Sequence, residues 1–313
     1  MPKRTDRTIY AGMSFETGLI FSKTIGSVEC YSAVARANDG EITTTTKIMQ
    51  NSGNTNGESF AVRAINRIFP VRTSGDFKRA AMKVLKHGNG KFESDVCIKD
   101  IDTQSNIFMR IMPLVFVLLL FVPIPSVIAL LLPVSNPLTL GIIETLFAPI
   151  LVFALFFGTF AALNKNTLMA KYHGAEHKAI ACLEANEPLT IPNVRKHSRS
   201  SVKCGTSFVL SVLFFVAIIG IGTLFFVNID STLMRAFIRA LSLPIAYALV
   251  FMVYKATINS DKKIAQVVIK IITAPGIWVQ NIISVDEPDD EQIEVAIAGI
   301  DALLAATEDK SKQ

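Results

Sequence analysis

Two histidines and a glutamate lie within one run of five residues, His173-Gly174-Ala175-Glu176-His177. On a helix, this spacing places both imidazoles on one face about one turn apart, so they can bind the same metal ion. Glu176 would then lie beside the ion, as a general base or as a further ligand. The pattern predicts a catalytic metal site. The alternative is a solvated helix on which these side chains are ordinary surface polar groups.

A catalytic zinc ion generally has three protein ligands and one open position, so a third ligand is needed. The segment after the motif offers His197 and Cys204. Cys204 follows Lys203 and begins an apolar helical segment, where the cation and the helix dipole both favour the thiolate. The alternative is that Cys204 is simply a small residue entering the bilayer. Zinc suits imidazole and thiolate ligands best, with iron and nickel as alternatives.

Three further polar residues can surround the site without binding the metal. Glu184 shares a helical face with His177, but it lies about 10 Å away along the axis, too far to share an ion. Arg195 and Arg199 either satisfy membrane topology and anionic lipid or bind a phosphate group. We therefore expect these three side chains to support the ligands or to face a substrate.

The chain is too apolar to be soluble throughout. Half of its 313 residues are hydrophobic, and they gather in blocks after residue 106. A run of roughly 20 apolar residues crosses a hydrocarbon core. Arg235 and Arg239 fall in the first two turns of the last block, where we expect them to reach the interface. Four blocks are long enough to cross a membrane: 107–132, 138–163, 204–228 and 233–254.

The positive charges between these blocks predict the orientation. The link 133–137 has no lysine or arginine, whereas the link 164–203, which carries the histidine motif, has seven. By the positive-inside rule, this long link and both termini are cytoplasmic. The same topology accounts for the net charge of +5, and no aromatic-studded basic patch indicates nucleic-acid binding. The four cysteines form no C-x-x-C pair, which fits a reducing compartment.

Cytoplasmic elements are expected before and after the membrane region in the sequence, which spans residues 105–260. Residues 1–50 are rich in β-formers: strands over 28–36 and 41–48 enclose the turn signal Asn38-Asp39-Gly40 and predict a hairpin, with one or two strands before it. Residues 51–104 show the periodicity of amphipathic helices.

Residues 261–313 predict two more helices. The first, 262–272, is amphipathic and is expected to end at Pro275-Gly276, with Trp278 as an interfacial anchor. The second begins at Asp289 or Asp290, and its apolar stripe needs a partner, most simply the N-terminal hairpin. The predicted fold is mainly α: a polytopic membrane protein with about four transmembrane helices, a small N-terminal β-hairpin region and cytoplasmic helices.

Two blocks of this sequence resemble one family. The first runs from Tyr172 through the histidine motif to Lys178, then through N-V-R-K, S-R and C-G-T-S-F over 193–208. The second is P-G-I-W at 275–278 followed by E-P-D-D-E-Q-I-E-V-A at 287–296. Both are similar to the YqhQ-like bacterial membrane proteins, a domain of unknown function usually labelled a predicted metal-dependent enzyme. The resemblance covers most of residues 105–307, and it implies a metal site and a place in the bacterial cytoplasmic membrane.

The chain departs from this family near the candidate third ligand. The family often has a histidine and a proline shortly before the cysteine, where this chain has Ser201 and Val202. If that histidine is a family ligand, either His197 replaces it or metal binding is weaker here.

These observations lead to two hypotheses of different class. The first is a membrane-bound metal-dependent hydrolase at the cytoplasmic membrane surface, with Glu176 as base and a lipid-linked or juxtamembrane protein substrate. The second is a non-catalytic multi-pass scaffold with at most a structural metal. Membrane lipids are partners in both cases, and nucleic acid in neither. Transport is a weaker alternative, because Glu144 is the main polar residue within the spans.

Overall fold

The computed structural model describes residues 10–15, 18–25, 28–36, 40–50, 123–147, 167–226, 231–258 and 260–311. The chain forms two compact units that alternate along the sequence. The first, the sheet unit, comprises residues 1–106, 166–200 and 285–313, and the second, the membrane unit, comprises 107–165 and 201–284. The amphipathic helices predicted over 51–104 lie outside the described residues.

The sheet unit contains four antiparallel strands in the order β1-β2-β3-β4. The strands β3 (Val28–Arg36) and β4 (Ile42–Gln50) form the hairpin that the sequence predicts. Gly40 lies between them with a φ of 86°, a conformation that glycine adopts without the steric cost of a Cβ. The strands β1 (Tyr10–Phe15) and β2 (Gly18–Ile25) precede this hairpin, so the expected additional strands are also confirmed.

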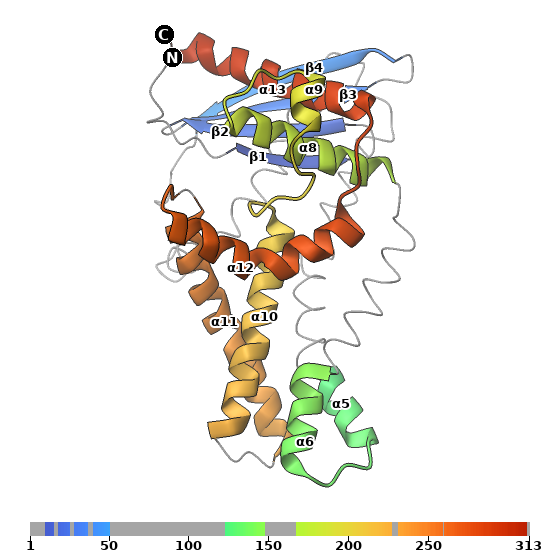
Figure 1. Cartoon of the computed structure of the whole chain (residues 1–313), viewed down its shortest axis with the longest axis vertical. Coiled ribbons are helices and arrows are strands. Elements are labelled where there is room, and N and C mark those ends of the chain that lie inside the picture. The colour runs from blue at the N-terminus through green and yellow to red at the C-terminus, as the bar shows by residue number, and fades with distance from the viewer. Residues whose placement is uncertain are drawn as a thin grey trace. The chain divides into compact units, whose positions relative to one another are not determined.

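Three described helices belong to the sheet unit: α8 (Leu168–Glu184), α9 (Ile191–Arg195) and α13 (Asp290–Ser311). Helix α13 packs against β2, β3, β4 and α8, and α8 also packs against β1 (Figure 1). The predicted partnership of the last helix with the N-terminal hairpin is therefore confirmed. The shared core combines residues of the sheet with residues of both long helices, among them Leu19, Phe21, Val34, Ala175, Ala179, Ile293, Ile300 and Leu303.

Helix α8 has its own start and is not a simple continuation of an apolar span. Thr167 has an extended backbone, and its hydroxyl accepts a hydrogen bond from the amide of Ala170, which caps the helix. The chain thus enters the motif-bearing helix from a non-helical residue. This separates the histidine motif from the block 138–163, of which residues 148–163 are outside the described part of the chain.

The membrane unit is helical throughout its described residues. Helices α10 (Gly205–Phe226) and α11 (Thr232–Thr257) pack against each other through buried valines and an alanine, among them Val216, Ala246 and Val250. The described elements are α5 (Pro123–Leu131), α6 (Pro137–Ile142), the π-helix η1 (Ile143–Phe147), α10 (Gly205–Phe226), α11 (Thr232–Thr257), α12 (Lys263–Val279) and the π-helix η2 (Gln280–Ser284).

Three described helical segments are long and apolar enough to cross a membrane: Gly205–Leu224, Thr232–Thr257 and Lys263–Ser284. The first two match predicted blocks. The third corresponds to the helix that the sequence predicts at the interface. The predicted count of four spans is not confirmed, because residues 107–122 and 148–163 lie outside the described residues.

Helix α12 continues past the point where the sequence predicts its end. It runs through Pro275 to Val279 and passes directly into η2. Gly276 lies so close to α10 that a Cβ there would come within 2.3 Å of the Cα of Ser207. The hydroxyl of Ser211 donates to the carbonyl of Ile272 at 2.9 Å, one turn before Gly276. The packing against α10 therefore outweighs the helix-breaking tendency of Pro275.

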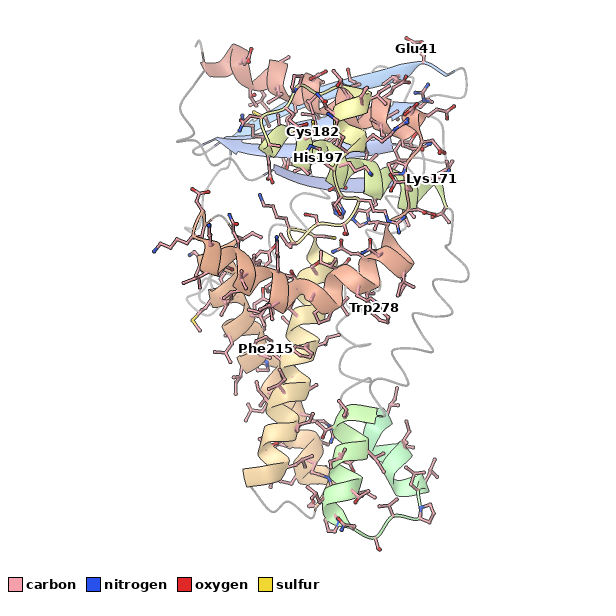
Figure 2. All side chains as sticks on the ribbon, viewed as in Figure 1. Glu41, Lys171, Cys182, His197, Phe215 and Trp278 are labelled. Carbon is pink, nitrogen blue, oxygen red and sulfur yellow. The ribbon has the colours of Figure 1, made fainter. Side chains whose placement is uncertain are left out.

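One face of α12 is apolar and exposed. Ile264, Val267, Ile271 and Trp278 lie on it, and each is more than half exposed. Figure 2 labels Trp278 on this helix. The opposite face packs within the membrane unit, where α12 runs across α10 and α11 instead of alongside them (Figure 1).

Glu144, Arg235 and Arg239 form a buried ion cluster in the membrane unit. Arg235 donates two hydrogen bonds to Glu144, from Nε at 2.9 Å and from Nη2 at 3.0 Å, and Nη1 of Arg239 donates a third at 2.9 Å. Nη2 of Arg239 also donates to the hydroxyl of Ser126 at 2.9 Å. The prediction that these arginines extend to the interface is wrong, because a carboxylate on the neighbouring helix satisfies them inside the unit.

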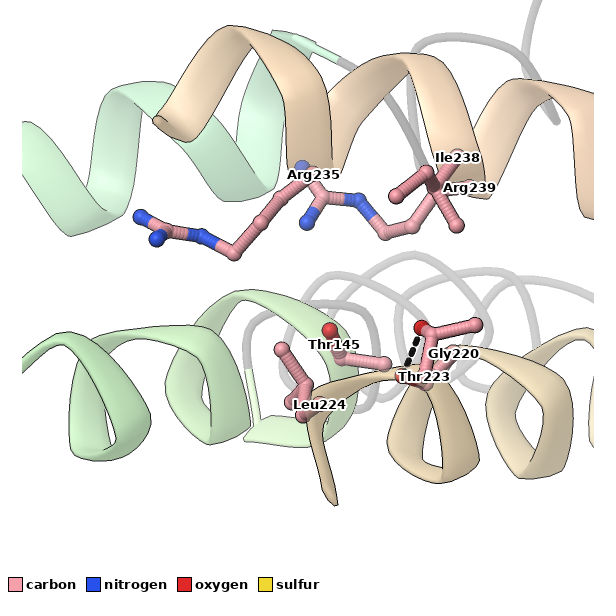
Figure 3. A pocket seen from close by; sticks show the side chains of 7 residues that line it. All are labelled: Thr145, Gly220, Thr223, Leu224, Arg235, Ile238 and Arg239. Atoms are coloured by element: carbon pink, nitrogen blue, oxygen red, sulfur yellow. Dashed lines mark hydrogen bonds between the residues drawn. The ribbon is translucent and has the colours of Figure 1, made fainter. Parts of the chain in front are cut away.

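Beside this cluster lies a cavity of about 10 Å³, room for about one water molecule (Figure 3). Thr145, Gly220 and Thr223 line it together with the two arginines. A space of this size provides no path for a solute. Glu144 is fully buried and bound to both arginines, so it is not the freely accessible carboxylate that the transport alternative requires.

Candidate metal centre

Helix α8 places His173 and His177 side by side, as their spacing predicts. The ring centroids are 4.5 Å apart and the ring planes are inclined by 56°. Glu176 and His177 are each only 6% exposed. The alternative of a solvated helix is therefore wrong for this face of α8, which packs within the sheet unit.

A backbone carbonyl fixes the orientation of His177. Its Nδ1 lies 2.6 Å from the carbonyl oxygen of Arg199. Because a carbonyl can only accept, Nδ1 carries the proton and donates it, which leaves the lone pair on Nε2. Histidines that bind metals commonly have this arrangement, with one ring nitrogen held by an acceptor and the other available to the ion.

Lys178 holds the segment that supplies this carbonyl. Its buried ammonium donates to the carbonyls of Arg195 at 3.0 Å and His197 at 2.8 Å, and it forms an ion pair with Glu287 at 2.7 Å. The sequence indicates no role for Lys178 beyond topology. Only the fold brings the two carbonyls to it, so no local sequence signal could have identified this function.

Glu176 is buried against β1. A Cβ at Gly12 would lie 2.2 Å from Oε1 of Glu176, so this position accepts only a glycine unless the carboxylate moves. Oε2 of Glu176 is buried and has no hydrogen-bond partner among the residues that the structure describes. Burial raises the pKa of Glu176 to about 7, although the nearby His173 opposes the shift. The carboxyl group is therefore poised near neutrality.

The segment before α13 lies against α8 beside the motif. A Cβ at Gly174 would come within 2.2 Å of the carbonyl oxygen of Asp286. Arg199 forms an ion pair with Asp286 at 3.5 Å, and Arg195 forms one with Asp290. The two predicted arginines thus bind acidic residues of the C-terminal segment, and this contact helps to fix the segment 195–199.

The structure distributes the other predicted site residues differently. Glu184 is exposed at the last position of α8, in keeping with its exclusion as a ligand. His197 lies with Cys182 and Glu187 in a separate group. Cys204 belongs to the membrane unit, directly before α10; it is partly exposed and not in a disulfide.

The groups on α8 fit a divalent metal ion. Imidazole nitrogen is a ligand for zinc and related metals, and a carboxylate oxygen is either a further ligand or a base. The unsatisfied oxygen of Glu176 is an independent indication, since a buried polar atom ordinarily has a partner.

Comparison with known proteins places the chain in a family. Residues 72–306 match the family described as "Protein of unknown function (DUF1385)". The chain belongs to the DUF1385 family. It is also 37% identical over 163 residues to "Uncharacterized protein YqhQ" of Bacillus subtilis (strain 168), an alignment that covers 52% of this chain and 48% of that protein. The chain thus spans about half the length of this curated relative. No solved structure matches.

Proposed function

We propose that this protein is a membrane-bound, metal-dependent hydrolase that acts at the cytoplasmic surface of the membrane. The observation that carries the proposal is the hydrogen bonding of two neighbouring side chains, His177 and Glu176. His177 has its Nδ1 held by a carbonyl, which frees Nε2 for an ion, and Glu176 keeps a buried oxygen without a hydrogen-bond partner among the described residues.

In this proposal, His173 and His177 are metal ligands, and zinc is the ion that suits them best. Cys204 is the proposed third ligand. In the sequence, only residues 200–203 separate it from Arg199, whose carbonyl oxygen accepts a hydrogen bond from His177. The carbonyl of Arg199 and the ammonium of Lys178 are positioning groups. They hold the imidazole in one tautomer and orientation, which strengthens a ligand without contact to the ion.

Glu176 is the proposed general base. A catalytic base works best when its pKa lies near the working pH, and burial brings this carboxyl group to about 7. Gly12 leaves room for the carboxylate on the side of β1. When bound, a divalent metal lowers the pKa of a water molecule towards neutrality. Glu176 would accept a proton from the water molecule while that water attacks a carbonyl or phosphoryl centre of the substrate.

The membrane arrangement is part of the proposal. Four spans with both termini in the cytoplasm would keep the sheet unit on the basic, cytoplasmic side. Helix α12 would lie along the inner interface, because its apolar face with Trp278 is exposed and its other face is packed. A site on such a surface suits a lipid-linked substrate or the juxtamembrane segment of another protein.

The test separates metal binding from catalysis. Full-length protein in lipid nanodiscs is loaded with Zn²⁺ and assayed with p-nitrophenyl acetate and p-nitrophenyl phosphate as probes, then with lipid-linked esters. We expect Glu176→Gln to keep its zinc and to lose hydrolysis by about 100-fold or more. His177→Ala should lose both, and Glu291→Gln, which alters an exposed acid of α13, should retain both. Unchanged hydrolysis by Glu176→Gln would contradict the proposal, and zinc without any hydrolysis would favour a non-catalytic scaffold.

A further inference from the structure

The turn after α8 brings together three side chains that the proposed hydrolase does not use. Cys182, Glu187 and His197 each offer one ligand atom, and these atoms all lie within 4.8 Å of one another. Figure 2 labels Cys182 and His197 at the end of α8 and the segment after α9. All three residues belong to the sheet unit.

The backbone fixes two of these residues with respect to each other. Asn186 adopts a left-handed conformation with a φ of 58°, which reverses the chain at the end of α8. The amide of Glu187 then bonds to the carbonyl of Cys182, and the amide of Asn186 bonds to that of Leu183. This is the Schellman pattern of helix termination, and it returns Glu187 to the position of Cys182.

The third residue is held from two sides. Lys178 donates to the carbonyl of His197, and the amide of His197 bonds to the carbonyl of Val194 at the end of α9. The imidazole is therefore presented by a fixed backbone and not by a free loop. Nε2 of His197 lies 3.5 Å from Oε2 of Glu187.

Two polar atoms at this point find no hydrogen-bond partner in the described part of the chain. Both Nε2 of His197 and Oε2 of Glu187 are buried and have no hydrogen-bond partner within the described ranges. Cys182 is a fully buried free thiol, and within the described residues its Sγ contacts two backbone carbonyls, at 3.7 and 3.9 Å. Two buried polar atoms that face each other without a hydrogen bond point to a ligand that binds both.

We propose that Cys182, Glu187 and His197 form a second metal site, separate from the histidine motif, that takes a zinc-like divalent cation. Thiolate, imidazole and carboxylate are the ligand types that this class of ion prefers. Bonds of about 2.0 to 2.3 Å to one ion are compatible with ligand atoms as close as these. Because the side chains of Glu187 and His197 are partly exposed, the ion enters from their side while the sulfur stays buried.

A nucleophilic role for Cys182 is less well supported by the same geometry. The residue is 0% exposed, so a substrate cannot reach its sulfur, whereas a bare ion can approach past Glu187 and His197. Burial, together with the nearby Glu187, also raises the pKa of the Cys182 thiol, which opposes thiolate formation in the absence of a cation. Metal binding reverses this preference, since a coordinated thiol loses its proton.

The site would clamp the segment that supports the first one. His197 and Arg199 are two residues apart, and the carbonyl of Arg199 holds His177. A cation bound by Cys182 and His197 would tie this segment to the end of α8. The proposal does not depend on hydrolysis, or on whether the histidine motif binds a metal.

The experiment uses Co²⁺ as the probe, because a cobalt–thiolate bond gives a charge-transfer absorption in the near ultraviolet that imidazole ligands alone do not give. Full-length protein carrying His173→Ala and His177→Ala, purified in detergent, is titrated with Co²⁺. We expect one bound equivalent with the thiolate absorption. Adding Cys182→Ser should remove the absorption, whereas Cys97→Ser should leave it unchanged.

One further variant, together with the choice of serine in Cys182→Ser, protects the test against a misfolded protein. Serine at 182 can still donate to the same carbonyls, and Glu187→Gln alters a side chain that is partly exposed. We expect Glu187→Gln to weaken cobalt binding at least tenfold while the helix content measured by circular dichroism stays unchanged. Cobalt should raise the unfolding temperature in the parent and not in Cys182→Ser. Absence of the thiolate absorption in the double-histidine variant, or its persistence after Cys182→Ser, would overturn the proposal.

Discussion

The two units treat a buried carboxylate in opposite ways. In the membrane unit, both oxygens of Glu144 accept hydrogen bonds from arginines. In the sheet unit, Glu176 is almost as deeply buried, yet one oxygen has no hydrogen-bond partner among the described residues. A paired buried charge stabilises the structure in the sense that removing one partner leaves the other charge buried and uncompensated. A buried carboxylate without such partners opposes folding when it is charged, so its presence is better explained by a ligand or a reaction.

Replacing the paired carboxylate should cost the most. Glu144→Gln removes the carboxylate charge that Arg235 and Arg239 share inside the unit. We expect a loss of about 3 to 5 kcal/mol in unfolding free energy, the usual effect of breaking a buried ion pair from one side. Unfolding in mixed micelles with increasing SDS measures it. Glu184→Gln, at an exposed position, is the control, and a loss as small as that of the control would show that the cluster is not structural.

The second largest effect should come from the helix crossing in the membrane unit. Gly276→Ala places a methyl group within 2.3 Å of the Cα of Ser207, and backbone cannot move aside as a side chain can. We expect a loss of about 1 to 3 kcal/mol from overpacking. Gly222→Ala is the matched control, because a Cβ there meets nothing within 4 Å. Equal stability of the two variants in the same unfolding assay would contradict the close contact between α10 and α12.

A smaller effect, on metal affinity, is expected from the lysine that positions the segment 195–199. Lys178→Met keeps the length and apolar stem of the side chain but removes the donor to the carbonyls of Arg195 and His197. The carbonyl of Arg199 is then held less firmly against His177. We expect zinc affinity, measured by competition with a chelating dye, to fall about 10- to 100-fold. Lys196→Met alters an exposed lysine of the same segment. It serves as the control and should change zinc affinity little.

The smallest effect on stability should be at the unpaired carboxylate. Glu176→Gln removes a desolvated charge whose Oε2 has no hydrogen-bond partner among the described residues, so we expect the unfolding free energy to fall by less than about 1 kcal/mol or to rise. The measurement is the same as for Glu144→Gln, which makes the two glutamates a matched pair. A loss of several kcal/mol at Glu176 would mean that it is a structural residue like Glu144.

Local patterns were enough to predict several elements of the fold. The turn signal at Asn38-Asp39-Gly40 gave the hairpin, and the acids at 289 and 290 gave the start of α13. The spacing of His173 and His177 gave their common face. Each of these depends on residues that are neighbours along the chain.

The features that the sequence did not predict depend on distant residues. Arg235 and Arg239 find Glu144 more than 90 positions away, so hydropathy alone assigned them to the interface. The helix-breaking residue Pro275 is retained within α12 because Gly276 packs on Ser207. His197 was considered as a ligand beside the motif, but tertiary structure brings it to Cys182 and Glu187. Lys178 acts through backbone carbonyls, which no side-chain pattern encodes.

The metal content of the purified full-length protein tests the central claim most directly. Measured by mass spectrometry in a Cys182→Ser background, which silences the second site, the protein should contain one zinc per chain. His173→Ala and His177→Ala should each lose that ion, whereas His87→Ala, which alters the only histidine outside the two groups, should keep it. Equal zinc in all three histidine variants would contradict a metal centre on α8.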